Sequence, residues 1–329
     1  MRQFRKLKIA GSNPVRGFMA KQIWYGRCIF LSWYCDLGTC KFCFRSTIKH
    51  KIKHAKHAKR SLASLIVETL LCKNLGWRIE FLTGGYGIFP FKDIVKIAKI
   101  ISQIYGEKIW INLGALKPEE LEQLRPYVKG IVASIETVNQ DLHNQVCPDK
   151  PIEPYSQMLK TAQGFQKSIT IVIGLGEKPE HIEELHQFIK EHNLDRITFY
   201  ALKPVKGTPY TKGPETNYYA EWIKKTREKF PKLQIIAGTT ALRYQEVGTL
   251  IKAGANAFTK FPATKLFNSP QAKSIEKQIK PLGNFTSTLT KLPKINWQKQ
   301  INDLNIEKDL KEQVKITLNN YLKKMKLAE

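Results

Sequence analysis

The chain has 329 residues, 42% of them hydrophobic and 25% charged, which is typical of a folded globular protein with one large domain or two ordinary ones. No stretch is long and apolar enough to span a membrane, and no apolar segment follows the basic residues at the start, so we expect a cytoplasmic protein with reduced cysteines. The 54 lysines and arginines outnumber the 28 acidic residues and give a net charge of +26, which favours an anionic partner or reflects a solvated, lysine-rich surface.

Along the chain, the first distinctive feature is an apolar run at residues 26–33 that leads directly into three closely spaced cysteines. The run predicts a strand, and the cysteines are Cys35, Cys40 and Cys43. Three thiols this close together are typical of a soft-metal site rather than of a disulfide framework. A closed zinc site would add a fourth ligand nearby, whereas an iron–sulfur cubane on three thiolates leaves one iron open to a small molecule. We therefore expect an iron–sulfur cluster, with zinc as the alternative.

A strongly basic segment, residues 49–60, follows the cysteines. It combines lysines and an arginine with three histidines. We expect a solvated, partly mobile loop that places positive charge beside the mouth of the cysteine site.

Beyond this segment, strand and helix patterns alternate, which predicts a parallel sheet with crossover helices. The expected strands are residues 26–33, 79–83, 108–113, 131–135, 169–173, 196–202, 233–237 and 255–258. Helices are expected at residues 61–75, 94–104 and 179–191, and another opens at Pro118. Eight strands with seven intervening helical segments fit an α/β fold of the (β/α)₈ TIM type, or a partial barrel of six strands with an added pair.

The C-terminal part is lysine-rich but carries apolar residues at helical spacing between Leu310 and Met325. This spacing predicts an amphipathic helix packed on the barrel. We therefore divide the chain into an N-terminal extension (1–22), a barrel (23–285) and a C-terminal helical tail (286–329).

Residues suited to ligand binding follow several of the predicted strands. In a parallel barrel, the residues that act lie at the C-terminal ends of the strands. Those ends carry Thr83, Gly84, Gly85 and Tyr86 after the second strand, Glu136 after the fourth, and Gly174, Gly176 and Glu177 after the fifth. Glycines let a ligand approach the backbone and expose its N–H and C=O groups. Each turn alone is a weak signal, but together they predict a ligand site at this rim.

The cysteine loop and these turns resemble the radical S-adenosylmethionine (SAM) superfamily, over roughly residues 24–280. An aromatic residue just before the last cysteine is usual in that family, and Phe42 occupies this place. The family's common spacing has three residues between the first two cysteines, whereas Cys35 and Cys40 have four, and Gly38 can absorb the extra one. The resemblance implies a [4Fe-4S] cluster and SAM as cofactors. The implied metal ligands are Cys35, Cys40 and Cys43, and the implied cofactor-binding residues are Phe42, Thr83, Gly84, Gly85, Tyr86, Glu136, Gly174, Gly176 and Glu177.

The C-terminal half narrows the resemblance. Residues 198–209 and 250–256 are similar to a segment shared by biotin synthase, methylornithine synthase and the hydrogenase maturation maturase. Residues 239–244 and 253–262 most resemble a component of the archaeal two-protein lipoyl synthase. This implies a 5'-deoxyadenosyl radical that serves sulfur insertion into a protein-bound octanoyl chain. The implied partners are an acidic lipoyl carrier domain, a second radical SAM protein and an electron donor.

Sulfur insertion also needs a sulfur source, and relatives use an auxiliary iron–sulfur cluster. Cys28, Cys72 and Cys147 are the remaining cysteines. We expect Cys147 near the mouth of the barrel and the other two toward its opposite end, where small buried hydrophobes are the alternative interpretation. Cys147 is therefore the better candidate ligand.

The sequence is also compatible with three other functions. The first is a small-molecule radical SAM enzyme of the biotin or methylornithine synthase type. The second is a tRNA-modifying radical SAM enzyme, which the charge favours, although the basic runs have few interleaved aromatics and nucleic acid is not the favoured partner. The third is a non-enzymatic protein that binds zinc or nucleic acid.

Overall fold

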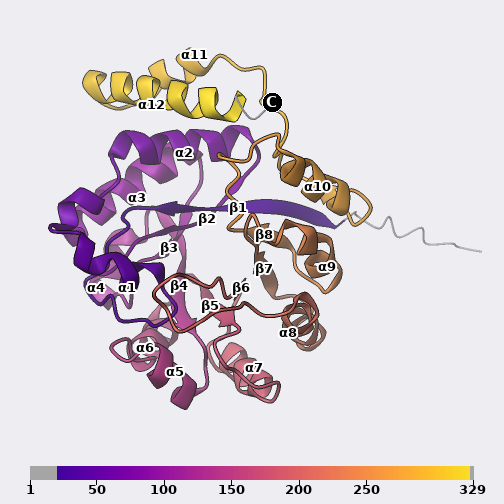
Figure 1. The fold of residues 1–329 in the computed structure, drawn as a ribbon. Coiled ribbons are helices and arrows are strands. Elements are labelled where there is room, and N and C mark those ends of the chain that lie inside the picture. Colours follow the sequence, from indigo (N-terminus) through magenta and orange to yellow (C-terminus); the bar gives the residue numbers. More distant parts are fainter. Residues whose placement is uncertain (1–20, 327–329) are drawn as a thin grey trace, which may run out of the picture.

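A closed ring of parallel strands forms the centre of the computed structural model, which describes residues 21–326 (Figure 1). Strands β2 to β8 follow one another in chain order, β8 pairs with β1, and β1 also pairs with β2. The strands are β1 (Gln22–Phe30), β2 (Arg78–Thr83), β3 (Ile109–Asn112), β4 (Val128–Glu136), β5 (Gln166–Ile173), β6 (Arg196–Ala201), β7 (Gln234–Gly238) and β8 (Ala257–Thr259). The predicted (β/α)₈ barrel is confirmed, and closure of the ring excludes the partial barrel.

Helices surround the ring in Figure 1. They are α1 (Phe44–Ile48), α2 (Leu62–Asn74), α3 (Phe91–Tyr105), α4 (Pro118–Leu124), α5 (Gln140–Val146), α6 (Glu153–Thr161), α7 (His181–Glu191), α8 (Thr216–Lys229), α9 (Val247–Lys252), α10 (Pro270–Ile279), α11 (Trp297–Asn302) and α12 (Lys308–Lys326). The helix predicted at residues 61–75 begins where expected because the Ser61 hydroxyl accepts a hydrogen bond from Ser64 N and so caps α2. None of the helices among the described residues combines the length and apolar character that crossing a membrane requires.

Strand β1 differs from the prediction because it ends at Phe30 rather than at residue 33. Beyond Phe30, the backbone turns to the segment that precedes α2: Leu31 O accepts from Arg60 N at 2.9 Å, and Ser32 forms an antiparallel bridge with Lys59. The early end of the strand puts Cys28 inside the barrel, not at its far end as predicted. A short strand that the sequence did not predict, β9 (Asn284–Phe285), pairs with β1.

The basic segment 49–60 has more structure than predicted. It forms the 3₁₀ helices η1 (Lys49–Lys51) and η2 (Ala55–Ala58), followed by the bridge that Lys59 makes with Ser32. Ala58 is buried, whereas most of the charged side chains of the segment are exposed. Nearly all of the predicted N-terminal extension, 1–22, lies outside the described residues.

The predicted C-terminal helix is α12, and it packs on α2 (Figure 1). Val314, Leu318 and Met325 are buried in this contact, which removes their apolar surface from water. The amphipathic pattern in the tail therefore predicted both the helix and its packing face.

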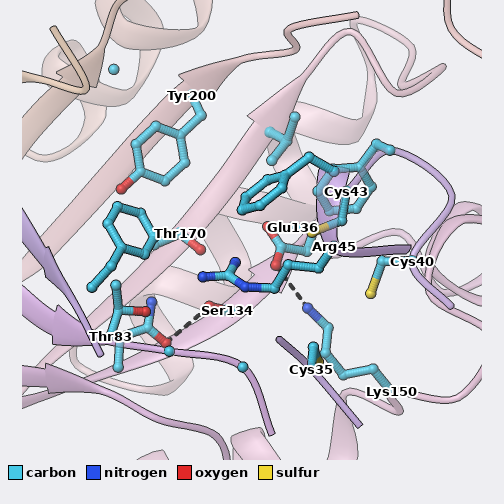
Figure 2. Close-up of a pocket in the computed structure, with 18 of the residues that line it drawn as sticks. Cys35, Cys40, Cys43, Arg45, Thr83, Ser134, Glu136, Lys150, Thr170 and Tyr200 are labelled. Atoms are coloured by element: carbon cyan, nitrogen blue, oxygen red, sulfur yellow. Dashed lines mark hydrogen bonds and ion pairs between the residues drawn. The ribbon is translucent and has the colours of Figure 1, made fainter. Parts of the chain in front are cut away.

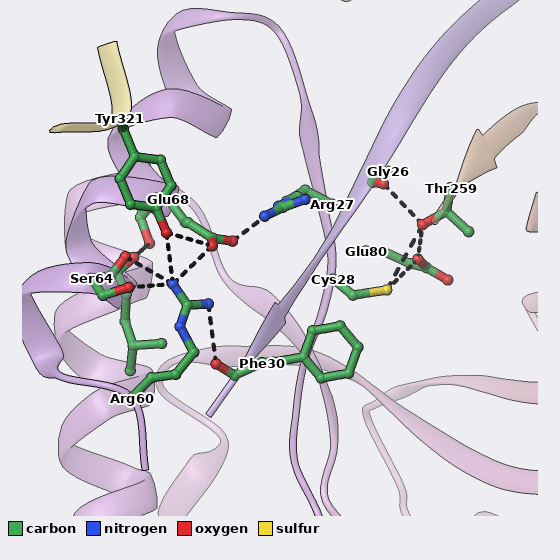
Figure 3. Close-up of polar contacts among 12 residues, drawn as sticks. Gly26, Arg27, Cys28, Phe30, Arg60, Ser64, Glu68, Glu80, Thr259 and Tyr321 are labelled. Atoms are coloured by element: carbon green, nitrogen blue, oxygen red, sulfur yellow. Dashed lines mark hydrogen bonds and ion pairs between the residues drawn. The ribbon is translucent and has the colours of Figure 1, made fainter. Parts of the chain in front are cut away.

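A buried carboxylate, Glu68 of α2, adds polar contacts between the barrel and the outer helices (Figure 3). It pairs with Arg27 Nε of β1 at 2.9 Å and with Arg60 Nη2 at 2.8 Å, and it accepts a hydrogen bond from the Tyr321 hydroxyl of α12 at 3.1 Å. Burial alone would raise the pKa of Glu68, but the two guanidinium groups outweigh this effect and lower it. The carboxylate is therefore ionised and links three elements.

Candidate active site

A cavity of about 310 Å³ lies at the C-terminal ends of the barrel strands (Figure 2). Most of the residues that we predicted as site residues line it. These are Cys35, Cys40, Phe42, Cys43, Thr83, Gly84, Gly85, Tyr86 and Glu136. The rim of the barrel thus brings together residues from the cysteine loop, the β2 turn and the end of β4.

The cysteine loop has a defined conformation that depends on Gly38 and Lys49. Gly38 has φ +57°, a left-handed conformation that favours glycine, and this is how the loop accommodates the extra residue between Cys35 and Cys40. The Lys49 ammonium donates to Asp36 O and, at 3.1 Å, to Leu37 O. The first lysine of the basic segment therefore holds the loop in place.

The turn after β2 packs directly against the first cysteine. A Cβ atom on Gly85 would lie 1.9 Å from Tyr34 O and 2.6 Å from Cys35 Cα, so only glycine fits there. Tyr86 N donates to Cys35 Sγ at 3.4 Å, and Asp36 N donates to Tyr86 O at 3.1 Å. Gly85 therefore allows two backbone segments to approach each other closely, and the Tyr86 amide donates a hydrogen bond to the first cysteine.

The second cysteine of the loop lies against Cys147, at the C-terminal end of α5. A hydrogen bond from the Cys147 thiol lowers the pKa of Cys40 to about 7, although burial opposes this effect. The same contact, together with burial, raises the pKa of Cys147. Cys40 is therefore disposed to be a thiolate near neutral pH, which is the form that ligates metals, and Cys147 stays a thiol.

The remaining cysteines are not brought together. Cys147 is buried beside Cys40, close to the mouth where it was predicted, but it does not line the cavity, and Cys28 lies inside the barrel, with its thiol 2.8 Å from Glu80 Oε2. Cys72 is buried in α2 and lines a second cavity at the opposite end, among the first residues of several strands.

The donor set of the cysteine loop fits a cluster better than a single metal ion. Cys35, Cys40 and Cys43 line one cavity, yet no three cysteine, histidine or acidic side chains among the described residues converge on a point that would hold a single ion. A zinc ion needs its sulfur ligands at about 2.3 Å from one centre. In a cubane, each thiolate binds a different iron, so the sulfurs need not converge.

Glu136 and Lys150 form a buried ion pair at the cavity wall (Figure 2). Lys150 Nζ lies 2.7 Å from Glu136 Oε1, and only 9% of Glu136 and 6% of Lys150 are exposed. Burial alone would lower the pKa of Lys150, but attraction to Glu136 raises it above its ordinary value. Sequence patterns missed Lys150, because it lies in the loop after α5 rather than at a strand end.

A second buried carboxylate, Glu80 of β2, lies in the barrel interior below the cavity (Figure 3). It accepts hydrogen bonds from the hydroxyls of Tyr200 at 2.9 Å and Thr198 at 3.1 Å, and from Thr259. The Cys28 thiol completes the set. In the sequence, this site was visible as an acidic residue between the apolar residues of β2. The hydrogen-bonded group around Glu80 forms a polar floor, and Tyr200, which belongs to it, lines the cavity.

Three predicted residues, Gly174, Gly176 and Glu177, do not line the cavity. The Glu177 carboxylate accepts hydrogen bonds from Gly174 N at 2.7 Å, Leu175 N at 2.9 Å and Gly176 N at 3.2 Å, so the turn after β5 closes on itself. Burial raises the pKa of Glu177, although these amides oppose it. The role of Gly174, Gly176 and Glu177 in binding the cofactor stays a prediction.

Comparison with known proteins gives the site a context. Residues 31–189 match the family model described as Radical SAM superfamily. The chain is 36% identical to an uncharacterized protein of Methanocaldococcus jannaschii, over 92% of this chain and 89% of that protein. It is 28% identical to the biotin synthase of Clostridium botulinum, over 66% of this chain and 71% of that enzyme.

Two solved structures share the fold. Methylornithine synthase aligns with a TM-score of 0.63 at 21% identity, over 73% of this chain and 72% of that one. The FeFe-hydrogenase maturase of Carboxydothermus hydrogenoformans aligns with a TM-score of 0.62 at 14% identity, over 94% of this chain and 81% of that one. At these identities, the likeness shows the fold alone.

Proposed function

The chain belongs to the radical SAM superfamily, and we propose that it is an enzyme of the biotin synthase and methylornithine synthase type, which removes a hydrogen atom from a small molecule held in the barrel. The observation that carries this proposal is that Cys35, Cys40 and Cys43 line the same cavity as the ends of β2, β4 and β6. A substrate in the barrel would therefore lie next to the cysteine loop.

Members of this superfamily use a [4Fe-4S] cluster and SAM, and Cys35, Cys40 and Cys43 would hold the cluster here. When bound, the two cofactors together supply abstraction of hydrogen from an unactivated C–H bond. The chain favours the thiolate form of one ligand, because the Cys147 thiol donates to Cys40 and lowers its pKa, and it orients a second, because Tyr86 N donates to Cys35.

The other lining residues would position the reactants and exclude water. Glu136, fixed by Lys150, presents negative charge to an ammonium group, and Thr83 adds a hydroxyl at the end of β2. Phe81 and Val172 make part of the wall apolar, which keeps water away from a reactive intermediate. These roles require a bound substrate to lie within the barrel rather than on its surface.

A second candidate function is sulfur insertion into an octanoyl chain on an acidic lipoyl carrier domain. The exposed charges of segment 49–60 beside the cysteine loop favour it, because they would steer an acidic domain to the mouth. Since Cys28, Cys72 and Cys147 are not brought together, a second radical SAM protein would supply the sulfur, and an external electron donor would reduce the cluster.

Reductive cleavage of SAM tests the proposed function. Protein purified without oxygen, then given dithionite and SAM, should form 5'-deoxyadenosine, and alanine at any one of Cys35, Cys40 and Cys43 should abolish it. Cys72→Ala is the matched control and should retain it, because Cys72 lies at the other end of the barrel. Absence of 5'-deoxyadenosine from a wild type that carries a full cluster would refute the proposal.

Binding of a lipoyl carrier domain separates the two candidates. The second candidate predicts salt-sensitive binding that a Lys51→Glu and Lys53→Glu double variant weakens about tenfold. Equal binding of the carrier domain by the wild type and the double variant would count against the second candidate and favour the small-molecule function.

A further inference from the structure

Several cations that line the cavity have no acidic partner. Among the described residues, the lining contains the three cysteines of the loop, one carboxylate, Glu136, and four cations, Arg45, Lys150, Lys203 and Lys260. Glu136 is paired with Lys150, and no ion pair of the described residues includes the other three. The Glu80 carboxylate, below the cavity, pairs with none of these cations, since it accepts its hydrogen bonds from hydroxyls and a thiol. The cations without an ion pair can therefore bind an anionic group of a ligand.

Lys260 follows β8 and has an unusual backbone. Its φ is +68°, and the only other described residues with positive φ, glycines aside, are Asn193, Asn268 and Glu136. Asparagine tolerates this conformation, whereas for lysine and glutamate it is strained, and strained residues cluster at functional sites. Both charged members of the set line the cavity.

The Lys260 ammonium lies over two aromatic rings rather than beside an acid. Nζ is 4.4 Å from the ring centre of Tyr200 and 5.9 Å from that of Phe30. Within the described part of the chain, it makes no hydrogen bond or ion pair. All of its donors are therefore available to a ligand in the cavity.

Arg45, in the first turn of α1 just after the cysteine loop, approaches the Phe30 ring as well. Its guanidinium carbon is 5.4 Å from the ring centre of Phe30 and 4.9 Å from that of Phe44, and Nη2 donates to Ser32 O at 3.2 Å. Its Nε is buried and has no partner among the described residues. A buried N–H without an acceptor is unfavourable, and Figure 2 shows the guanidinium pointing into the cavity, where a ligand oxygen would satisfy it.

We propose that Lys260 and Arg45 bind a carboxylate of the substrate. This inference rests on the proposed radical reaction and specifies its substrate as a small carboxylic acid with an apolar body, since Phe30, Phe81 and Val172 line the space beside the two cations. A guanidinium fork and an ammonium are the donors that carboxylates prefer. An octanoyl chain in amide linkage to lysine has no carboxylate to offer these two cations.

The surroundings favour a carboxylate over a phosphate. Phosphate sites commonly recruit backbone N–H groups from a helix N-terminus or a glycine loop. Lys260 and Arg45 instead lie over the rings of Phe30, Phe44 and Tyr200. The Tyr200 hydroxyl is directed to Glu80, so the ring itself faces the ammonium.

Matched acid and amide probes test the inference on the cluster-loaded enzyme with SAM bound. Calorimetric titration without oxygen would compare butanoate, hexanoate and octanoate with their primary amides. We expect the best acid to bind at least tenfold more tightly than its amide. Lys260→Gln and Arg45→Gln should each reduce this ratio at least fivefold, whereas Lys265→Gln, an exposed lysine beyond the cavity, should leave it unchanged. Iron content and circular dichroism would verify that each variant is folded and loaded.

SAM carries a carboxylate of its own, which Lys260 and Arg45 could bind instead of the substrate's. The SAM dissociation constant of each variant distinguishes these two carboxylates. Loss of the acid preference with unchanged SAM affinity supports the inference. The inference is overturned if no acid binds more tightly than its amide, or if the preference for the acid survives both substitutions. It is also overturned if the variants weaken only the binding of SAM. Failure of SAM cleavage in the wild type would instead count against the proposed function, and the same samples report it.

Discussion

Replacing Lys150 with methionine should destabilise the protein by about 3–5 kcal/mol, because it leaves the Glu136 carboxylate buried without its cation. At the observed 2.7 Å, Coulomb attraction is about 6 kcal/mol with an effective dielectric constant of about 20. Desolvation of the two charges cancels much of this energy, so the pair itself adds little net stability. The cost of the substitution therefore arises from the unpaired charge that remains.

A second substitution isolates that cost. The Lys150→Met, Glu136→Gln double variant removes both charges and should recover about half of the lost stability, whereas unrelated effects would simply add. Urea unfolding followed by circular dichroism in an anaerobic cell measures each free energy of unfolding. A loss below about 1 kcal/mol in the single variant, or no recovery in the double variant, would refute the reasoning.

The pH dependence gives an independent test of the same pair. Attraction to Glu136 raises the pKa of Lys150 in the folded state, although burial alone would lower it. A raised pKa contributes stability that is fully present below the unfolded value of about 10.4 and is lost as pH rises through the folded value. The difference between the wild type and Lys150→Met should therefore be the same at pH 7 and pH 9.

Three further predictions concern other parts of the fold. Glu68→Gln should lower the free energy of unfolding by about 2–4 kcal/mol, because two partly buried guanidinium groups lose their buried counter-charge, whereas Asp303→Asn in an exposed pair should change it by less than about 0.5 kcal/mol. Gly85→Ala should prevent iron loading, because its Cβ would overlap Tyr34 O, and Gly84→Ala should load normally, so equal iron in the two variants would contradict this account. In cluster-free protein, alkylation of Cys40 should titrate near pH 7, and Cys147→Ala should move this midpoint to higher pH; an unmoved midpoint would mean that the thiol contact does not set it.

Much of the barrel was predictable because its strands are apolar runs separated by amphipathic helices. The loop geometry was predictable at Gly38, since only glycine readily takes the left-handed conformation that the extra residue requires. The end of β1 was not, because Phe30 and Leu31 continue the apolar run while the backbone already pairs with the segment before α2. That error misplaced Cys28.

The polar contacts within the site were harder to predict. Periodicity indicates which face of an element is buried, but not which distant side chains meet there. Lys150 reaches Glu136 from the loop after α5, and Cys147 reaches Cys40 from the end of that helix. Arg45 and Lys260 were within reach of sequence reasoning, since one follows the cysteines and the other follows a strand end, but only the structure reveals that neither has an acidic partner among the described residues.

The most direct test of the central claim is the iron, sulfide and zinc content per chain of protein purified without oxygen. The account predicts about four irons and about four sulfides in the wild type and none in a variant with alanine at Cys35, Cys40 and Cys43. It also predicts that Cys28→Ala and Cys72→Ala keep the full content, because those thiols lie apart from the loop. Zinc without iron in the wild type, or iron that survives the triple substitution, would contradict it.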